Sequence, residues 1–316
     1  MEQYNVQRVL ATALFGDVVL CEDRRTGDHV AIKRMHLAAA KDQKTLVDQK
    51  IVAENVDFEA QVNHTIHAAG GHPHVLRMRT EFVQHDYLHF VYDYCEGGDL
   101  LDKLAAATRF DRHTALTYFS DIVAAVHRLH EIGFAHRDLS LENVLLGGDN
   151  DCQLCDFGLA CDAATIQTAV VGKKYYMAPE VVAGSNYDAT KADVWSLGVL
   201  LFEMLSGGPL FNEAAPSDPR FLVLQSEGST ILFQDLVDTD IAHLLGDLLC
   251  LDPLKRPSMD TVLRHSVVVS ARLSKRTPPS LISDCMAALA TSNIVAYLNR
   301  VLFSPWQNPT AVSRAG

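Results

Sequence analysis

The stretch that decides the fold reads HRDLSLEN at residues 136–143, and the tripeptide DFG follows it at residues 156–158. Asp138 is a carboxylate that could orient a hydroxyl group and accept its proton, a role worth about 10²–10⁴ in rate. Asn143, five residues further on, could reach a metal ion. The carboxylate of Asp156 is the expected main ligand of Mg²⁺, because Mg²⁺ prefers oxygen donors and phosphate groups.

A lysine stands upstream, at the end of an expected strand that reads VAIK at residues 30–33. An ammonium group held there would project toward the α- and β-phosphates of a nucleotide. Alone this signal is weak, because apolar strands that end in a surface lysine are common. Beside a base and metal ligands, Lys33 would supply the cation that phosphoryl transfer from ATP requires.

Six motifs follow one another along the chain: VAIK, HRDLSLEN, DFGLA, YMAPE, DVWSLGV and DPLKRPS. In this order they resemble the eukaryotic protein kinase family, and the match runs from about Tyr4 to about His265. The resemblance implies an α+β, bilobal fold, with a small β-rich N-lobe at residues 1–92, a hinge at residues 93–99 and a larger, mainly helical C-lobe at residues 100–270. It also implies transfer of the γ-phosphoryl group of ATP, with Mg²⁺, to hydroxyl groups of protein substrates.

The hydrophobic pattern predicts elements in the same order. We expect strands at residues 6–20, 29–34, 82–83 and 88–92, and helices at residues 45–69, 111–130 and 193–205. Residues 271–316 are expected to form a C-terminal helical extension, because apolar residues recur at helical spacing over residues 280–303. Packing back onto the large lobe is preferred there, and a helix that binds a partner is the alternative.

The resemblance also assigns roles around the nucleotide. Glu59 is preferred over Glu54 as the helix carboxylate that pairs with Lys33, and Tyr92 falls at the gatekeeper position, where it could equally be a packed aromatic. The residues expected to bind the nucleotide are Ala11, Ala13, Gly16, Val18, Ala31, Lys33, Glu59, Tyr92, Asp93, Cys95, Asp99, Asn143, Leu145, Cys155 and Asp156, with Asn143 and Asp156 also as metal ligands. Asp193 would brace the catalytic loop, and Glu180 would form a buried ion pair with Arg256.

The glycine-rich loop of the family is altered. Its GxGxxGxV pattern aligns with ATALFGDV at residues 11–18, so that only Gly16 remains. Glycine lets backbone N–H groups approach phosphates closely, and the alanines therefore predict weaker ATP binding rather than none. A pseudokinase that acts as a scaffold is the alternative to an enzyme, although Lys33, Asp138, Asn143 and Asp156 favour catalysis.

A second departure concerns the residues beside the catalytic aspartate. Most serine/threonine kinases have a lysine at the position of Ser140 and a threonine at the position of Lys173. Here the two residue types have changed places, which predicts that Lys173 contacts Asp138 and the γ-phosphate while Ser140 bridges below. The alternative is that Lys173 points to solvent with Lys174 and that Ser140 tolerates a missing contact. The downstream motifs SLG and DPLKR favour serine/threonine specificity over a tyrosine or dual-specificity kinase.

Regulation and substrate choice also follow from the resemblance. Arg137 would receive a phosphate on Thr168, with Thr165 as the second candidate. In kinases that prefer basic substrates, certain positions contact arginines that precede the acceptor residue. Three carboxylates align with these positions and would favour such arginines by charge-assisted pairing, namely Asp99, Glu142 and Glu203.

Composition narrows the class of protein. A net charge of −12 argues against nucleic-acid binding, which relies on a surplus of lysine and arginine. Seven scattered cysteines do not form a disulfide framework, and the amino terminus lacks the pattern of a signal peptide. No apolar run is long enough for a membrane span. We expect a cytoplasmic protein, with the nucleus as an additional location, and the sequence leaves the oligomeric state open.

Overall fold

The chain divides into two compact units, residues 1–272 and residues 273–316. The computed structural model describes residues 1–148, 150–233 and 238–276. The helices and strands of these residues belong to the first unit, apart from the end of the last helix. The helical spacing at residues 280–303 lies outside the described residues.

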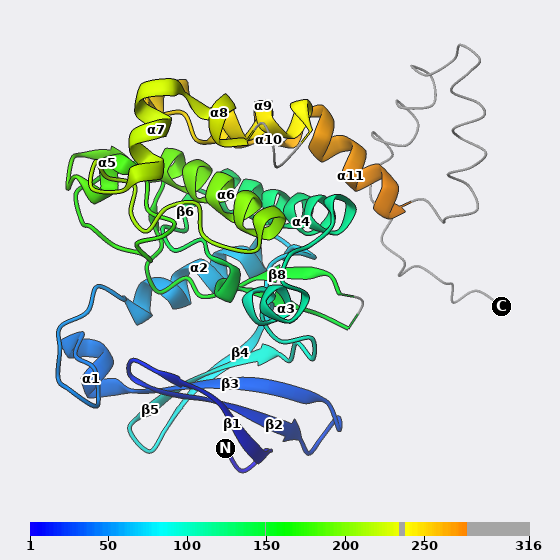
Figure 1. The fold of residues 1–316 in the computed structure, drawn as a ribbon. Helices are drawn as coiled ribbons and strands as arrows, with labels where there is room; N and C mark the ends of the chain where they lie inside the picture. Colours follow the sequence, from blue (N-terminus) through cyan, green and yellow to red (C-terminus); the bar gives the residue numbers. More distant parts are fainter. Residues whose placement is uncertain (149, 234–237, 277–316) are drawn as a thin grey trace. The chain divides into compact units, whose positions relative to one another are not determined.

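Five antiparallel strands form one sheet in the order β1-β2-β3-β5-β4. The strands are β1 Tyr4–Ala13, β2 Gly16–Asp23, β3 His29–His36, β4 Met78–Gln84 and β5 Tyr87–Asp93. Short turns join β1 to β2, β2 to β3 and β4 to β5, which favours antiparallel pairing of these neighbours. Figure 1 shows this sheet below the helical part of the unit, with α2 (Val56–Ala68) between them. The α+β, bilobal architecture expected from the motifs is confirmed.

The β1–β2 connection is a tight hairpin rather than an open loop. Ala13 pairs with Gly16, so the turn consists of Leu14 and Phe15 alone. Phe15 is 1% exposed and packs in an apolar cluster of the N-lobe. A Cβ atom on Gly16 would lie 1.9 Å from the carbonyl oxygen of Arg34 on β3, so the sheet itself requires glycine at this position.

The helix expected at residues 45–69 was predicted too long. Residues 43–55 contain no helix, whereas a short helix, α1 (Leu37–Asp42), precedes them. The helix α2 begins only after Asn55, whose side chain accepts a hydrogen bond from the backbone N–H of Phe58. An asparagine cap of this kind satisfies one of the free N–H groups of the first turn and fixes where the helix starts.

The C-lobe is built around two long helices, α4 and α6, which pack against each other. Its helices are α3 Leu100–Ala107, α4 Arg112–Glu131, α5 Pro179–Val182, α6 Ala189–Ser206, α7 Pro219–Glu227, α8 Ser229–Phe233, α9 Thr239–Leu248, α10 Met259–Leu263 and α11 Ser266–Arg276, with 3-10 turns at Leu141–Asn143 and Pro253–Lys255. Apolar residues on nearly every face of α6 make it the centre of the core, as expected for a helix without a solvent face.

Three two-stranded sheets position the loops of the C-lobe. The pairs are β6 (Phe134–Ala135) with β9 (Cys161–Asp162), β7 (Val144–Leu146) with β8 (Cys152–Leu154), and β10 (Ile166–Gln167) with β11 (Tyr187–Asp188). The first two pairs flank residues 136–143 and 156–158 and so bring the two motifs together.

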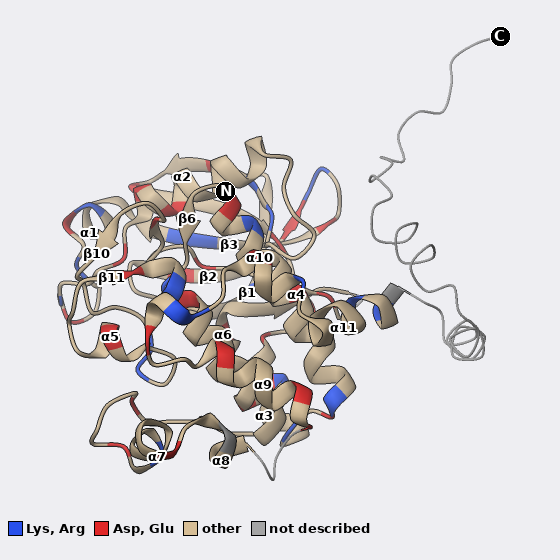
Figure 2. Cartoon of the chain, turned by 90° about the horizontal axis from the view of Figure 1, so that it is seen from above, with Lys and Arg blue, Asp and Glu red and all other residues tan. Residues whose placement is uncertain are grey.

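Charges of both signs are interspersed along the described elements rather than gathered in one basic stripe (Figure 2). In the same part of the chain, no helix has the length and apolar character needed to cross a membrane.

Candidate active site

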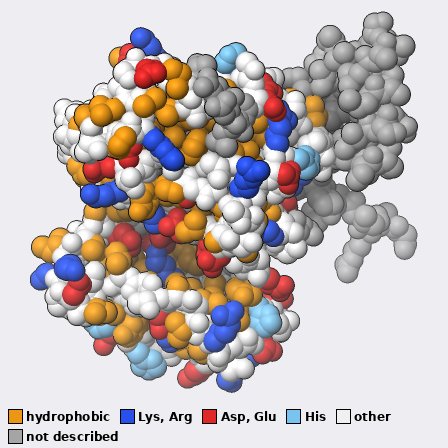
Figure 3. All heavy atoms as spheres, viewed as in Figure 1, with side chains coloured by type: hydrophobic (Ala, Val, Ile, Leu, Met, Phe, Trp, Pro, Cys, Tyr) orange, Lys and Arg blue, Asp and Glu red, His pale blue; other side chains and the backbone are white. Residues whose placement is uncertain are grey.

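A buried ion pair joins the two halves of the N-lobe. The ammonium of Lys33 on β3 lies 2.9 and 2.8 Å from the two carboxylate oxygens of Glu59 on α2 and 3.2 Å from Oδ1 of Asp156. Burial alone would lower the pKa of Lys33, but the carboxylates of Asp156 and Glu59 raise it well above its usual value. Lys33 in turn holds the pKa of Asp156 below its usual value. In the space-filling view, a hollow with basic and acidic side chains lies between the two lobes (Figure 3).

Tyr92 fixes the orientation of this pair. Its hydroxyl donates a hydrogen bond of 3.2 Å to Oε1 of Glu59 and accepts one of 3.3 Å from the amide of Asn63. Asn63 also donates to the backbone carbonyl of Glu59, at 2.9 Å. Tyr92 is thus both a packed aromatic and a polar partner. Asn63 was missed at the sequence level, because asparagine within a helix carries no signal for such a bond.

Glu54, the alternative partner of Lys33, lies in the same region but forms no ion pair with it. Its carboxyl group packs against Gly158, where a Cβ atom would come within 3.3 Å of its oxygen. Burial, together with the nearby Asp156, raises the pKa of Glu54 to about 7.

The catalytic-loop motif is held from below by Asp193 on α6. Its carboxylate accepts hydrogen bonds from the backbone N–H groups of His136, at 2.8 Å, and Arg137, at 2.9 Å. The side chain of Asn143 donates to Oδ2 of Asp138 at 2.9 Å and to the carbonyl oxygen of Asp138 at 2.8 Å. The expected bracing by Asp193 is therefore present, and the loop presents Asp138 and Asn143 side by side.

Two residues of the site have a left-handed backbone, Arg137 with φ 65° and Asp156 with φ 64°. This conformation is uncommon for residues other than glycine and concentrates at functional sites. The ring of His136 joins the two segments, since its Nε2 lies 3.1 Å from the carbonyl oxygen of Cys155.

Oxygen donors suited to Mg²⁺ converge here. The carbonyl of Asn143 accepts from the N–H of Cys155 at 3.0 Å, which sets Asn143 beside the strand end that carries Asp156. The side chain of Asp156 is 38% exposed. A partly open carboxylate and an amide fit Mg²⁺, which keeps several water and phosphate ligands.

The remaining residues expected near the nucleotide belong to the N-lobe sheet and to an apolar cluster. Ala11, Ala13, Gly16, Val18 and Ala31 lie on β1, β2 and β3, whereas Cys95, Leu145 and Cys155 belong to the apolar cluster that contains Tyr92. Two side chains are engaged elsewhere. Asp93 forms ion pairs with Arg77 and Arg79, and Asp99 caps α3.

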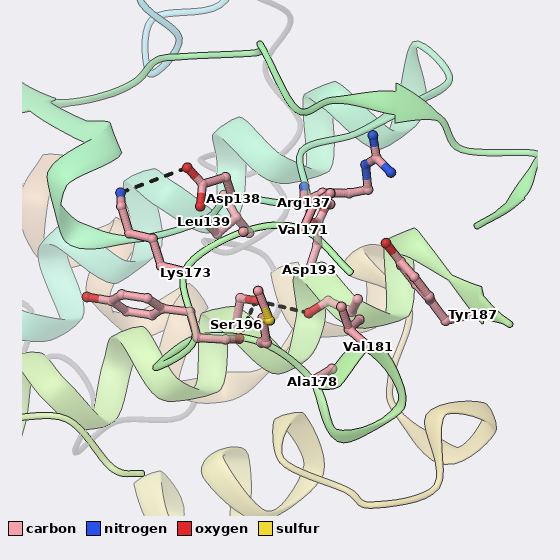
Figure 4. A pocket seen from close by; sticks show the side chains of 14 residues that line it. Arg137, Asp138, Leu139, Val171, Lys173, Ala178, Val181, Tyr187, Asp193 and Ser196 are labelled. Carbon is pink, nitrogen blue, oxygen red and sulfur yellow. Dashed lines mark hydrogen bonds and ion pairs between the residues drawn. The ribbon is translucent and has the colours of Figure 1, made fainter. Parts of the chain in front are cut away.

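Lys173 and Ser140 meet as the sequence predicts. The ammonium of Lys173 donates a hydrogen bond of 2.7 Å to Oγ of Ser140. It lies 3.9 Å from Oδ2 of Asp138 and 3.7 Å from Oε2 of Glu142. Figure 4 shows Lys173 and Asp138 pointing toward each other from separate segments.

The activation segment, residues 156–180 from the DFG motif to the APE motif, is attached to the catalytic loop, residues 136–143, through Arg137. Its guanidinium donates to the carbonyl oxygen of Leu159 at 2.6 Å and to the side-chain oxygen of Gln167 at 3.1 Å. The candidate phosphorylation sites Thr165 and Thr168 are exposed on either side of Gln167. Gln167 was not singled out from the sequence, since its role depends on the β10–β11 pairing.

Other charged pairs expected from the motifs can also be located. Arg256 binds Glu180 through two hydrogen bonds of 2.6 and 2.8 Å. Glu203, expected to meet a substrate arginine, is buried and accepts a hydrogen bond of 2.5 Å from the hydroxyl of Tyr176.

The sequence of this chain is similar to the sequences of known protein kinases. Residues 4–268 match the family model of the protein kinase domain. The serine/threonine-protein kinase SRK2F of Arabidopsis thaliana is 30% identical over 274 residues, which is 84% of this chain and 73% of that protein. SAPK3 of Oryza sativa subsp. indica is 31% identical over 274 residues, 84% of this chain and 77% of that protein. The Aurora kinase of Schizosaccharomyces pombe is 30% identical over 267 residues, 84% and 71% of the two chains.

Proposed function

This chain belongs to the protein kinase family, and from that premise we propose that it is an active serine/threonine kinase with Asp138 as its catalytic base. The observation that carries the proposal is the joined set of Lys33, Glu59 and Asp156, beside an Asp138 held by Asn143. A kinase site needs this lysine–glutamate pair and the DFG aspartate in place together.

The reaction divides among these residues. Asp138 would accept the proton of the substrate hydroxyl while the oxygen of that hydroxyl forms a bond to the γ-phosphorus. At the same time, the bond between the γ-phosphorus and the β–γ bridging oxygen would break, and ADP would leave. Lys33 would bind the α- and β-phosphates, and Asp156 with Asn143 would hold Mg²⁺. Bound Mg²⁺ neutralises the charge that develops on the phosphate oxygens.

A scaffold that binds ATP weakly is the second candidate, and the β1–β2 hairpin favours it. Alanines at positions 11 and 13 and the buried Phe15 leave few flexible backbone N–H groups to close over phosphates. Such a protein would bind nucleotide without transferring phosphate.

One experiment separates these functions. The purified protein is incubated with labelled ATP, Mg²⁺ and a degenerate peptide library, and the phosphorylated residue is identified. We expect label on serine and threonine, and a loss of at least about 10³-fold in kcat for Asp138→Asn and Asp156→Asn with melting temperatures unchanged. Wild-type-like turnover in either variant would exclude the kinase mechanism, and label on tyrosine would exclude the specificity.

We also propose that the substrates are proteins with basic residues before the acceptor. Glu142 supports this, because its side chain is 37% exposed and its carboxylate lies 3.7 Å from Lys173. The support is weaker for Glu203, which Tyr176 already binds, and for Asp99, which caps α3. A library profile without upstream arginine or lysine would rule this preference out.

We keep the cytoplasm as the proposed location. Five cysteines of the described residues are free thiols, which suits a reducing compartment, namely Cys21, Cys95, Cys155, Cys161 and Cys250.

A further inference from the structure

The proposed catalytic base, Asp138, is negatively charged and has to act close to a negatively charged phosphoryl group. Asp138 is a carboxylate, and the phosphoryl group that moves toward its bound hydroxyl is also negative, so the two repel each other. Lys33 binds Glu59 and Asp156 and forms no ion pair with Asp138. In the part of the chain that the structure describes, Lys173 is the one basic side chain within 4 Å of the Asp138 carboxylate.

Lys173 is held in place rather than free in solvent. Its ammonium donates to Oγ of Ser140, a side chain that is fully buried in the catalytic loop. The same ammonium lies 3.7 Å from Oε2 of Glu142, so this carboxylate also helps to hold Lys173 beside Asp138. The preceding residue, Gly172, has φ 99°, and a Cβ atom there would lie 2.6 Å from the carbonyl oxygen of Arg137. The backbone before Lys173 therefore packs closely against the catalytic loop, and this contact restricts the position of the Lys173 backbone and so of its side chain.

The next residue shows what an ordinary surface lysine does in this segment. The Lys174 side chain is 73% exposed and lies 3.5 Å from Glu213, whereas that of Lys173 is 36% exposed. Two adjacent lysines thus differ in their surroundings, and Lys174 provides a matched control.

Resting on the proposed kinase function, we propose that Lys173, anchored by Ser140, is the positioning residue that holds Asp138 for the acceptor hydroxyl and offsets charge at the transferred phosphoryl group. The cation comes from the activation segment rather than from the catalytic loop. A side chain of this length can reach the same point from either segment.

The test measures kcat and KM separately for purified variants of the full chain. Loss of an interaction made in the transition state lowers kcat and leaves KM unchanged. We expect Lys173→Thr and Lys173→Met to lower kcat about 10²-fold, with KM for peptide and ATP within about threefold. Lys174→Met should retain kcat within about twofold.

The decisive variant restores the cation from the other side. Lys173→Thr combined with Ser140→Lys should recover at least about tenfold of the kcat lost by Lys173→Thr alone, which a merely structural role would not produce. Melting temperatures of all variants show whether the fold is intact. Wild-type kcat in Lys173→Met, or a folded double variant no better than Lys173→Thr, would overturn the inference while leaving the kinase function standing. No transfer by the unmodified protein would overturn both.

Discussion

Lys33 on β3 and Glu59 on α2 form a two-fold hydrogen-bonded ion pair across 26 residues of sequence, with both side chains largely buried. The sheet and the helix each supply one partner, so the position of α2 determines whether Lys33 is aimed at Asp156. Tyr92 on β5 binds the same carboxylate and adds a third element to this arrangement.

Glu59→Gln is therefore expected to lower kcat/KM for ATP about 10–10²-fold, because a neutral amide orients the ammonium of Lys33 less firmly. Steady-state kinetics with varied ATP would measure it. Glu54→Gln is the matched control and should have a clearly smaller effect, since Glu54 makes no ion pair with Lys33. Equal losses in the two variants would contradict this assignment.

Glu180→Ala is expected to destabilise the protein by about 3–5 kcal/mol, because it leaves the buried guanidinium of Arg256 without its anion. The side chain of Arg256 is 0% exposed and stacks 5.1 Å from the centre of the Trp195 ring. Chemical denaturation would measure the loss. Glu213→Ala, which breaks an exposed pair with Lys174, should cost at most about 1 kcal/mol, and similar losses would refute the distinction.

Phosphatase treatment is expected to lower kcat about tenfold if the protein carries phosphate on Thr168, because a phosphate binds Arg137 more strongly than the neutral Gln167 does. The Thr165→Ala, Thr168→Ala double variant should be insensitive to the treatment. Residual activity should depend on Gln167, so Gln167→Ala should lower it further. Unchanged kcat after complete dephosphorylation, confirmed by mass spectrometry, would dismiss the activating phosphate.

His72 predicts how stability depends on acid. Burial, and then the neighbouring His74, lower the pKa of His72 to about 4, below its value of about 6.5 in the unfolded chain. The folded state therefore resists protonation. The contribution of His72 to the stability of the folded state is fully present above pH 6.5, and it declines as the pH falls toward 4.

We expect this loss to reach about 1–2 kcal/mol at pH 5, and His72→Asn should reduce it. Melting temperatures measured between pH 7.5 and pH 5 would show the difference. His64→Asn alters an exposed ring and serves as the control. Parallel curves for wild type and His72→Asn would disprove the role of His72.

Motifs that carry chemistry could be predicted from the sequence because their residue types and order are specific. Asp138, Asn143 and Asp156 lie in such motifs, and the structure brings them together. The exchange of Ser140 and Lys173 could also be noticed, since both halves of one contact had changed.

Features that depend on packing could not be predicted in the same way. The start of α2 was wrong because apolar residues such as Val52 continue the helical pattern past the true cap at Asn55. Gln167 and Asn63 carry no motif, and their hydrogen bonds arise only from the folded arrangement.

The β1–β2 hairpin has a consequence for the lifetime of a bound nucleotide. Phe15 is inserted into the N-lobe cluster, and the backbone carbonyls of Leu14 and Phe15 accept hydrogen bonds from Leu46 and His36. Because the hairpin is already held in place, its backbone needs little further ordering when ATP binds. Association would therefore lose less conformational entropy. The hairpin would not move away from the nucleotide independently of the N-lobe. ADP would then leave only when the two lobes separate. The time for which a nucleotide stays bound would then be governed by motion of the whole N-lobe.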